Sequence, residues 1–508
     1  MKNRRSRNSR RKGAKEGNDA PKAPAYIKRQ IPFYELLSEE GLVQIEQTTD
    51  RILAEVGLDF RGDDETIELW TKAGAEVDGE RVKFPKGMLR EILTTVPEEF
   101  TQHARNPKKS VQIGGNNVVM APCYGSPFVM DPDEGRRYAT IKDFENFVKM
   151  TYSTPWLHHS GGTICEPVDV PVNKRHLDMI YTHMRYSDKA FMGSITTQER
   201  AEDSIELCKV LFGQERLEKD CVILGNVNVN SPLVWDGEAT KVIRTYAAAN
   251  QACVIVPFIL GGAMGPVTNA GAIAQSIGEA MVGCALTQLV RPGAPAILGN
   301  FLSSTALRSG SPTFGTPEPA LGSMVIGQLS RRLKIPLRCS GSFTTSKLPD
   351  AQAARESTMS MLAAVQCGAN FILHSAGFLD SLLSMSYEKF VMDTDFCSAM
   401  HTYLGGLPVD ENSLAMDAFK EVGPGNHFFG SAHTLANYKT AYWESNIADN
   451  DSYEQWVENG SLDAQSRAKS RWKKLLEEYQ KPEMDEATDE ALQEYITKKK
   501  QASEDAWY

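Results

Sequence analysis

Lys347 occupies a position in the sequence where a lysine can do chemistry. It follows an apolar stretch, 337–343, that predicts a short strand, and Asp350 comes after it at the start of a predicted helix, 350–366. Functional groups of α/β folds gather at the carboxyl ends of strands. A lysine there can act as a Schiff-base nucleophile or a general base if burial lowers its pKa, or it can bind a substrate carboxylate, restrained by Asp350. The plain alternative is a surface lysine, because most lysines are exposed.

A second group of candidates lies in and after the next predicted strand, 370–375. His374 lies in the apolar run ILHSAG, and Tyr387 and Glu388 come shortly afterwards in SYEKF. A histidine can transfer protons near neutral pH, but a histidine within an apolar strand is more often a hydrogen-bonded core residue than a ligand. The sequence has no HExxH motif and no aspartate or cysteine at metal-ligand spacing, so no metal site is expected.

Aromatic and amide residues mark the ends of other predicted strands. Tyr124 follows the first strand, Asn228 the fourth and Phe301 the sixth, while Gln352 begins the helix after Lys347. Glycine-rich turns at these ends, such as GGAMGP, favour a ligand pocket. A neutral, polar wall with aromatic faces suits a cation held by ring quadrupoles better than a phosphate held by arginines. For each aromatic ring, the alternative is a place in the core.

The elements that would position these residues recur regularly along the chain. Apolar strand candidates begin near Val118, Leu157, Ala190, Val222, Cys253, Ala296, Leu337 and Asn370. Helical segments are predicted between them at 141–152, 173–186, 198–212, 237–250, 268–290, 317–333 and 350–366. Eight strands at a period of about 30–40 residues, alternating with helices, predict an α/β fold of the (β/α)8 TIM-barrel type. An open, doubly wound sheet is the rival, and it is disfavoured because no GxGxxG or P-loop sequence follows any strand.

The chain divides into four expected regions. Residues 1–30 form a disordered basic tail, 31–116 an N-terminal helical cap, 117–400 the barrel, and 401–508 a C-terminal loop and helical extension. Within the last region, the amphipathic stretch 453–479 predicts a helical face that packs against the barrel or a second subunit. The charged residues at the end of the chain are expected to be solvated.

Composition narrows the classes of function. A net charge of -10 gives the body of the protein no reason to bind nucleic acid, although the Arg-rich start also admits a transit peptide or a nucleic-acid contact besides a solubilising tail. Nine scattered cysteines without a CxxC motif indicate reduced thiols and a cytoplasmic location. No apolar run reaches the roughly 18–20 residues of a membrane span. The nearest, 270–289, is interrupted by Gln275, Glu279 and Gln288.

Several longer motifs carry a family resemblance. They are GSPFVMD, SKLPDAQAARES, GANFILHSAG, SYEKFVMD, VGPGNHFFGSAHT and YEQWVENGSLDAQSRA. Together they closely resemble the trimethylamine methyltransferase (MttB) superfamily, over nearly everything from residue 32 to 479. The resemblance implies a TIM barrel that moves a methyl group from an amine to a corrinoid (cobalamin). Since the chain has no DxHxxG motif of a corrinoid-binding domain, the cofactor must arrive on a separate small corrinoid protein docked over the barrel mouth.

One departure from the family pattern bears on the substrate. The archaeal trimethylamine enzymes carry pyrrolysine in the barrel mouth, whereas this chain has only standard residues and Lys347 lies near the expected place. The chain is therefore similar to the non-pyrrolysine branch, which uses quaternary amines such as glycine betaine. A quaternary nitrogen already bears the charge that makes a neutral amine the leaving group, whereas a tertiary amine must first be activated.

On this interpretation the resemblance and the residue chemistry assign three roles. An aromatic cage for the cation would consist of Tyr124, Phe301 and Tyr387. A carboxylate end would be held by Lys347, Asn228, Gln352 and His374. Charge balance, or the positioning of Lys347, would come from Asp350 and Glu388.

Other functions stay open at this point. They are a trimethylamine:corrinoid methyltransferase, a Schiff-base lyase built on Lys347, and a non-catalytic betaine-binding or assembly protein. A folate in place of the corrinoid is a further alternative acceptor. The protein is expected to form a homo-oligomer and to bind neither nucleic acid nor membrane.

Overall fold

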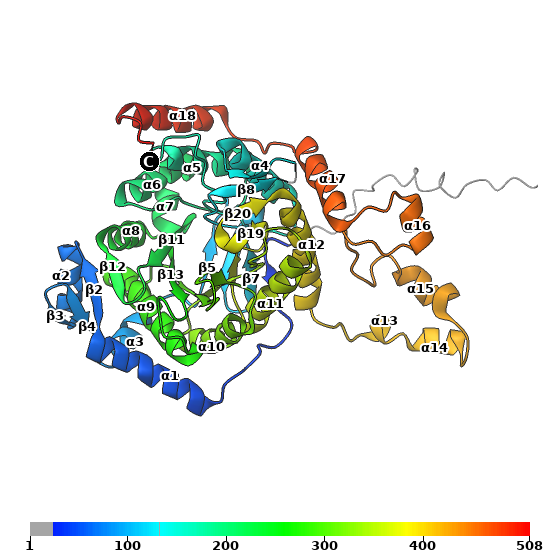
Figure 1. The fold of residues 1–508 in the computed structure, drawn as a ribbon, viewed down its shortest axis with the longest axis horizontal. Helices are drawn as coiled ribbons and strands as arrows, with labels where there is room; N and C mark the ends of the chain where they lie inside the picture. The colour runs from blue at the N-terminus through cyan, green and yellow to red at the C-terminus, as the bar shows by residue number, and fades with distance from the viewer. Residues whose placement is uncertain (1–23, 132, 508) are drawn as a thin grey trace, which may run out of the picture.

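A large sheet with a parallel core forms the centre of the molecule, and helices surround it (Figure 1). The computed structural model describes residues 24–131 and 133–507. In spatial order the parallel strands are β10 (Phe191–Met192), β11 (Ile223–Val229), β13 (Ala252–Leu260), β14 (Ala296–Gly299), β17 (Leu337–Ser340), β18 (Phe371–Leu373) and β7 (Asn117–Met120). Each strand pairs in parallel with the next. The α/β class is therefore confirmed, and seven of the eight predicted strands are present in the described residues.

The strand predicted to begin at Leu157 is not formed. The rings of His158 and His159, which follow Leu157, accept hydrogen bonds from backbone N–H groups that would otherwise be available to pair with a strand. Met120 N donates to His158 Nδ1 over 2.9 Å, and Gly161 N donates to His159 Nδ1 over 3.0 Å. Gly161 also has a positive φ of 93°, which interrupts an extended backbone.

The backbone of this irregular segment nevertheless contacts strands on both sides. His158 N donates to Met120 O in β7 over 2.9 Å. Met192 N in β10 donates to Gly161 O over 2.8 Å. The segment therefore lies between the first and last strands of the parallel series.

Helices follow the strands as predicted. They are α4 (Ile141–Ser153), α5 (Arg175–Tyr186), α6 (Gln198–Phe212), α8 (Gly237–Ala248), α9 (Asn269–Val290), α10 (Pro317–Leu333) and α11 (Ala351–Cys367). Two further helices, not among the predicted ones, are the short α7 (Gln214–Lys219) after α6 and α12 (Tyr387–Leu404) after β18. Local chemistry sets their ends. Thr140 forms a capping box at the start of α4, and Asp350 caps α11 by accepting from Ala353 N over 3.0 Å. Gly368 ends α11 in the left-handed conformation, with φ of 94°.

One described helix, α9, is long and apolar enough to cross a membrane by length and composition alone. However, 89% of its most apolar window is buried within the protein, where it packs against β13, α1 and α8. Its hydrophobicity is accounted for by its place in the core.

The N-terminal region packs against this body and contributes three short strands to the large sheet. It contains β1 (Ile27–Lys28), α1 (Glu39–Arg51) continued by a π turn (Ile52–Val56), β2 (Leu58–Arg61), α2 (Asp64–Ala73), β3 (Glu76–Asp78), β4 (Arg81–Lys83), α3 (Met88–Leu93), β5 (Glu99–Gln102), a 3-10 turn (Pro107–Lys109) and β6 (Val111–Gly114). The region thus contains strands besides the expected helices. Most of the predicted basic tail, residues 1–23, lies outside the described residues.

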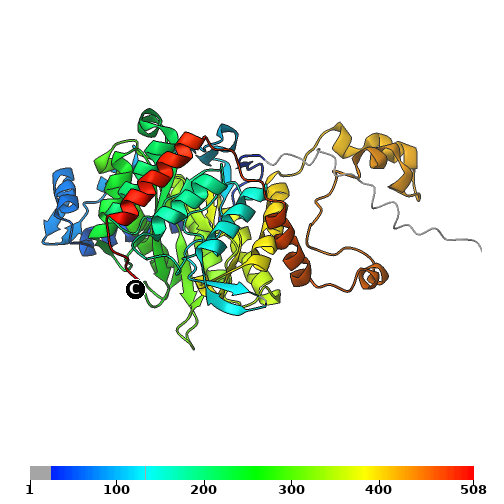
Figure 2. The same cartoon turned by 90° about the horizontal axis from the view of Figure 1, so that it is seen from above.

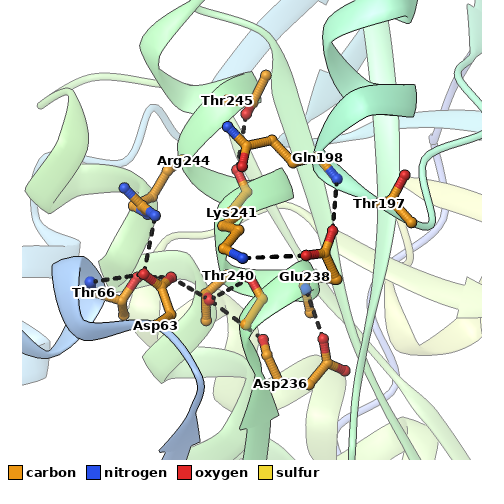
Figure 3. A network of polar contacts seen from close by, with 12 residues as sticks. Asp63, Thr66, Thr197, Gln198, Asp236, Glu238, Thr240, Lys241, Arg244 and Thr245 are labelled. Carbon is orange, nitrogen blue, oxygen red and sulfur yellow. Dashed lines mark hydrogen bonds and ion pairs between the residues drawn. The ribbon is translucent and has the colours of Figure 1, made fainter.

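A polar network joins this region to α8. Asp63, the cap of α2, accepts hydrogen bonds from Thr66 N at 3.3 Å, Thr240 Oγ1 at 2.6 Å and Arg244 Nη2 at 3.0 Å (Figure 3). In addition, β12 (Val234–Asp236) pairs in parallel with β2 and leads into α8. The start of α8 is therefore held from two sides.

Two smaller strand groups lie beyond the carboxyl ends of the parallel strands. A four-stranded sheet has the order β19 (Phe378–Leu379), β20 (Ser384–Ser386), β8 (Phe128–Asp131) and β9 (Gly135–Tyr138), with a 3-10 turn (Asp380–Leu382) between β19 and β20. After β14, strand β15 (Phe301–Thr305) extends alongside β13 and forms a hairpin with β16 (Pro312–Thr313).

The C-terminal region comprises α13 (Glu411–Leu414), α14 (Met416–Val422), a 3-10 turn (Phe428–Gly430), α15 (Ala432–Asn437), α16 (Tyr453–Glu458), α17 (Ala464–Glu477) and α18 (Glu486–Gln501). The predicted amphipathic stretch 453–479 is therefore two helices. The break contains Gly460 and Ser461, both with positive φ. Helix α17 packs against α12 and α4, so its apolar face meets the body as expected.

The expectation that the charged end of the chain is solvated holds for residues 501–507, which are exposed, but the helix before them packs on the body. Helix α18 packs against α5 and α6, and its Leu492 is fully buried. Tyr495 of α18 donates a hydrogen bond to the Asp203 carboxylate over 2.7 Å, and Lys500 contacts Asp178. An apolar stripe hidden between lysines and glutamates explains why composition alone missed this packing.

Candidate active site

A cavity of about 490 Å³ opens at the carboxyl ends of the parallel strands. Four of the predicted site residues line it, namely Tyr124, Asn228, Phe301 and His374. Other residues that line it are not among the predicted site residues, among them Glu166, Arg175, Arg200, Asn226, Asp236, Phe258, Met264 and Arg338.

His374 lies at the end of β18 and is held in a fixed orientation. Its φ of 59° is unusual for a residue with a side chain, and such strain is often found at functional sites. Arg338 Nη2 lies 3.0 Å from His374 Nδ1, and Tyr124 O lies 3.3 Å from Nε2. Because a guanidinium can only donate, Nδ1 accepts and Nε2 carries the proton. Burial and the neighbouring Arg338 charge lower the pKa of His374 well below 6.5, so the ring is neutral.

Arg338 comes from β17 and is almost completely buried beside the cavity. Its Nη1 donates to Asn300 O over 2.7 Å, and its guanidinium carbon lies 5.1 Å from the centre of the Phe301 ring. Burial lowers the pKa of Arg338 to about 10. In the part of the chain that the structure describes, no carboxylate pairs with this guanidinium, and its Nε has no hydrogen-bond partner. A buried charge is normally paired, so this cation is suited to an anionic group that enters the cavity.

Aromatic rings form a wall next to this cation. Phe258 and Phe301 lie with their ring centres 4.7 Å apart, and Phe301 lies 5.7 Å from the His374 ring. Tyr124 completes the lining, and burial raises the pKa of its hydroxyl to about 12, which keeps the phenol neutral. Phe343 packs behind Phe301 at 5.1 Å. Neutral rings of this kind can face a cation.

The polar part of the cavity is largely satisfied by internal contacts. Arg175 and Glu166 form a close ion pair, and Asp236 caps α8 by accepting from Ala239 N over 2.8 Å. Asn226 donates to Asn228 Oδ1 over 3.3 Å, and its own buried Oδ1 has no partner among the described residues.

Three predicted residues near β17 lie outside the cavity lining. Lys347 is exposed over 66% of its side chain, donates to Thr345 O over 2.8 Å and lies 3.7 Å from the Asp380 carboxylate. Asp350 accepts from Ser346 Oγ over 2.9 Å in addition to its role as the cap of α11. Gln352 is exposed and donates to Thr345 Oγ1 over 3.1 Å.

Tyr387 and Glu388, in the first turn of α12, form a contact with the C-terminal region. The Tyr387 ring stacks between Phe147 at 4.5 Å and Trp472 at 4.6 Å, and its hydroxyl donates to Asp143 over 2.8 Å. The Glu388 carboxylate accepts from Trp472 Nε1 over 2.7 Å. The predicted cage of Tyr124, Phe301 and Tyr387 is therefore not assembled as a unit around the cavity.

The geometry so far defines an α/β protein whose cavity combines a buried cation without a carboxylate partner in the described residues, a neutral histidine and aromatic faces. Within the described ranges, no group of three or more histidine, cysteine, aspartate or glutamate side chains could hold a metal ion. The cavity therefore suits a small molecule that bears an anionic end and an apolar or cationic end.

Comparison with known proteins gives the family. The family model "Trimethylamine methyltransferase (MTTB)" matches residues 2–504, and the chain belongs to this family. It is 38% identical over 470 residues to a glycine betaine methyltransferase of Desulfitobacterium hafniense, covering 92% of this chain and 98% of the relative.

More distant relatives carry different substrate names. The chain is 25% identical over 488 residues to a proline betaine:corrinoid methyltransferase of Eubacterium limosum, covering 93% of this chain and 99% of the relative. It is 26% identical over 461 residues to the trimethylamine methyltransferase MttB of Methanosarcina thermophila, covering 88% and 93%.

Proposed function

We propose that this protein transfers a methyl group from a quaternary amine with a carboxylate, glycine betaine or a related betaine, to a corrinoid carried by a separate small protein. The observation that carries the proposal is Arg338, a buried cation without a carboxylate partner among the described residues, beside the aromatic wall. A betaine supplies both the missing anion and a permanent cation for the rings. The 38% identity to a protein named glycine betaine methyltransferase supports the same choice.

In the proposed complex, Arg338 binds the substrate carboxylate with the donors that Asn300 O and His374 leave free. The quaternary nitrogen then lies against Phe258, Phe301 and Tyr124. These rings stabilise a positive charge without attracting water, and they leave one methyl group directed to the open end of the cavity.

The carbon–nitrogen bond breaks with its electron pair retained by nitrogen, so the leaving group is a neutral tertiary amine. No proton has to be delivered. The neutral His374 and the protonated Tyr124 phenol are consistent with this, because neither group is in a charged acid form. His374 instead orients Arg338 and fixes the direction of the guanidinium.

The corrinoid supplies the cobalt nucleophile that accepts the methyl group. The chain contains no DxHxxG motif, and the cavity volume of about 490 Å³ suits a small substrate with an open side better than a complete corrinoid. The chain's own contribution is therefore to bind, orient and desolvate the methyl donor.

For the fold, we propose that segment 157–161 completes a TIM barrel. The hydrogen bonds of His158 N to Met120 O and of Met192 N to Gly161 O support this closure, as does the ring of helices in Figure 1. The four regions with boundaries near 30, 116 and 400, a cytoplasmic location and a homo-oligomeric state belong to the same proposal. The nine buried, unpaired cysteines support a reducing compartment.

The test is methyl transfer by the purified protein with reduced cobalamin and glycine betaine, measured as dimethylglycine formed. Proline betaine, carnitine and trimethylamine serve as competing donors. We expect the carboxylated betaines to react and trimethylamine to react far more slowly, because trimethylamine leaves Arg338 without an anion. Absence of transfer from every donor would contradict the proposal.

Neither of the remaining alternatives has a structural feature in its favour. A Schiff-base lyase needs a desolvated lysine near the substrate, whereas the Lys347 amine is exposed and lies outside the cavity lining. A non-catalytic binding protein would bind betaine without producing dimethylglycine, so the same assay separates it.

A further inference from the structure

A long arm leaves the body after α12. We define the arm as residues 406–442, which contain α13, α14 and α15. Figures 1 and 2 show these helices projecting away from the body in both views. Both ends of the arm are fixed. Leu404 O accepts from Gln30 N over 2.8 Å at its start, and Trp443 Nε1 donates to Ser398 Oγ over 2.8 Å where the chain returns.

The arm exposes an unusual amount of apolar surface. Of the 26 large apolar side chains exposed in the described residues, ten belong to this arm. They are Leu407, Val409, Leu414, Met416, Phe419, Phe428, Phe429, Leu435, Tyr438 and Tyr442. By contrast, the buried positions of the arm are Ala418 and Ser431. The arm therefore has no core of its own, and water is not a favourable environment for its surface.

Polar contacts nevertheless give the arm a defined shape. Asp410 forms a capping box with Ser413 at the start of α13. The side chains of Asn412 and Asn437 exchange hydrogen bonds of 2.9 and 3.2 Å, which ties α13 to the end of α15. The helices that carry the exposed apolar side chains are thus held in a defined arrangement before the arm meets a partner, which lowers the entropic cost of binding.

The position of the root of the arm makes the small corrinoid protein an unsuitable partner for the arm. Next to the root, β1 pairs with Asn117 and Val118, the first residues of β7, so the arm leaves from the amino ends of the parallel strands. The cavity opens at their carboxyl ends. A protein that delivers a corrinoid to the cavity would dock on the other side of the body.

Area and charge fit a second copy of the chain. The ten side chains together offer on the order of 1,000 Å² of apolar surface, whereas a stable interface needs about 800 Å² per partner. Six of the 37 arm residues, or about 16%, are Asp, Glu, Lys or Arg, whereas these residues make up 24% of the whole chain. Depletion of charge with enrichment of aromatic residues is typical of the core of an oligomer interface.

We propose that the arm of each protomer packs against a second copy of this chain in a closed two-fold pair. A two-fold arrangement buries the apolar surface of both arms at once. It leaves no arm exposed to recruit further copies into an open-ended filament. The arm is rooted on the side of the body away from the cavity opening, so it leaves the cavity of its own protomer accessible to the corrinoid protein.

The first experiment measures the mass of the full-length protein by light scattering during gel filtration at micromolar concentration. We expect twice the monomer mass of 56.2 kDa for the wild type and 56.2 kDa for the double variant Phe429→Ser with Tyr442→Ser. These two side chains are exposed over 84% and 85%. The matched control is Leu307→Ser, which is equally exposed at 84% but lies in the β15–β16 hairpin, and it should remain dimeric. A monomeric wild type, or an unchanged mass for the double variant, would overturn the proposal.

A second measurement covers the case in which the double variant does not fold. All nine native cysteines are buried, so Phe429→Cys introduces a single reactive thiol. A photoreactive maleimide on this thiol should cross-link the purified protein into a covalent dimer, while the same label on Leu307→Cys should not. If labelled Phe429→Cys yields no covalent dimer, the arm does not face a second copy. Neither measurement depends on methyl transfer.

Discussion

Arg338 donates a hydrogen bond to His374 over 3.0 Å, and this contact joins two neighbouring strands, β17 and β18, at the cavity. Each of the two residues accounts for the state of the other. The guanidinium fixes the imidazole as a neutral acceptor, and the imidazole directs a cation that has no carboxylate partner in the described residues. Under the proposed function, the pair is an anion site assembled before the substrate arrives.

Arg338→Met should weaken glycine betaine binding by about 2–3 kcal/mol, roughly 30- to 150-fold, because a charged hydrogen-bond partner of the carboxylate is lost. Titration calorimetry measures the dissociation constant. Trimethylamine, which has no carboxylate, is the control ligand, and its affinity should not fall. An equal loss for both ligands would show that Arg338 does not act on the carboxylate. Thermal unfolding checks that the variant is folded.

Phe301→Leu should raise the dissociation constant for glycine betaine about 2- to 30-fold, since it removes an aromatic face worth roughly 0.5–2 kcal/mol to a cation. The matched control is Phe314→Leu, because Phe314 packs 6.1 Å from Phe301 but does not line the cavity. Similar losses in the two variants would indicate a general packing defect. The same calorimetric titration distinguishes these outcomes.

Lys347→Ala should change the rate of methyl transfer by less than about twofold, because an exposed amine with one neighbouring carboxylate contributes little. Initial rates with saturating and limiting glycine betaine provide the measurement. A loss of about a hundredfold or more would instead place this lysine in the reaction and revive its role as a nucleophile or carboxylate ligand.

Stability should fall as the pH drops from 6.5 toward 4. Burial lowers the pKa of His183 and of His401 to about 4, and it lowers the pKa of His374 well below 6.5. In this window the unfolded chain binds protons that the folded protein does not, so each group costs up to about 1.4 kcal/mol per pH unit. The stability is fully present above pH 6.5 and is lost as the pH falls toward the folded-state pKa.

The variant His401→Asn should reduce that slope by about 1.4 kcal/mol per pH unit between roughly pH 6 and 4.5. Urea unfolding at a series of pH values gives the slope directly. An unchanged slope would mean that His401 is protonated in the folded protein.

Much of the fold could be predicted because burial leaves a direct trace in the sequence. Strands such as β13 are continuously apolar, and helix ends carry caps such as Asp350 and Gly368. The segment after Leu157 could not be predicted, since its histidine rings compete with the backbone for hydrogen bonds.

The site was only partly predictable for a related reason. Tyr124, Asn228, Phe301 and His374 follow from their positions at strand ends, but whether Lys347 turns inward depends on the path of a loop. Arg338 could have been predicted, because a charged residue inside the apolar strand LRCS indicates a buried charge. Buried charges with perturbed pKa values are common at functional sites. Tyr387 lies outside the cavity lining, and Trp472, much further along the chain, covers its ring.

Helix α18 gives residues 486–501 an influence on the entrance of the cavity. It contacts Asp178 of α5 through Lys500 and Asp203 of α6 through Tyr495. The first turns of α5 and α6 supply Arg175 and Arg200 to the cavity lining. A chain shortened after α17 would uncover the groove that Leu492 fills and loosen both arginines at once. Helix α18 therefore supports the cavity from outside it, and a purification tag on the amino-terminal side avoids disturbing this contact.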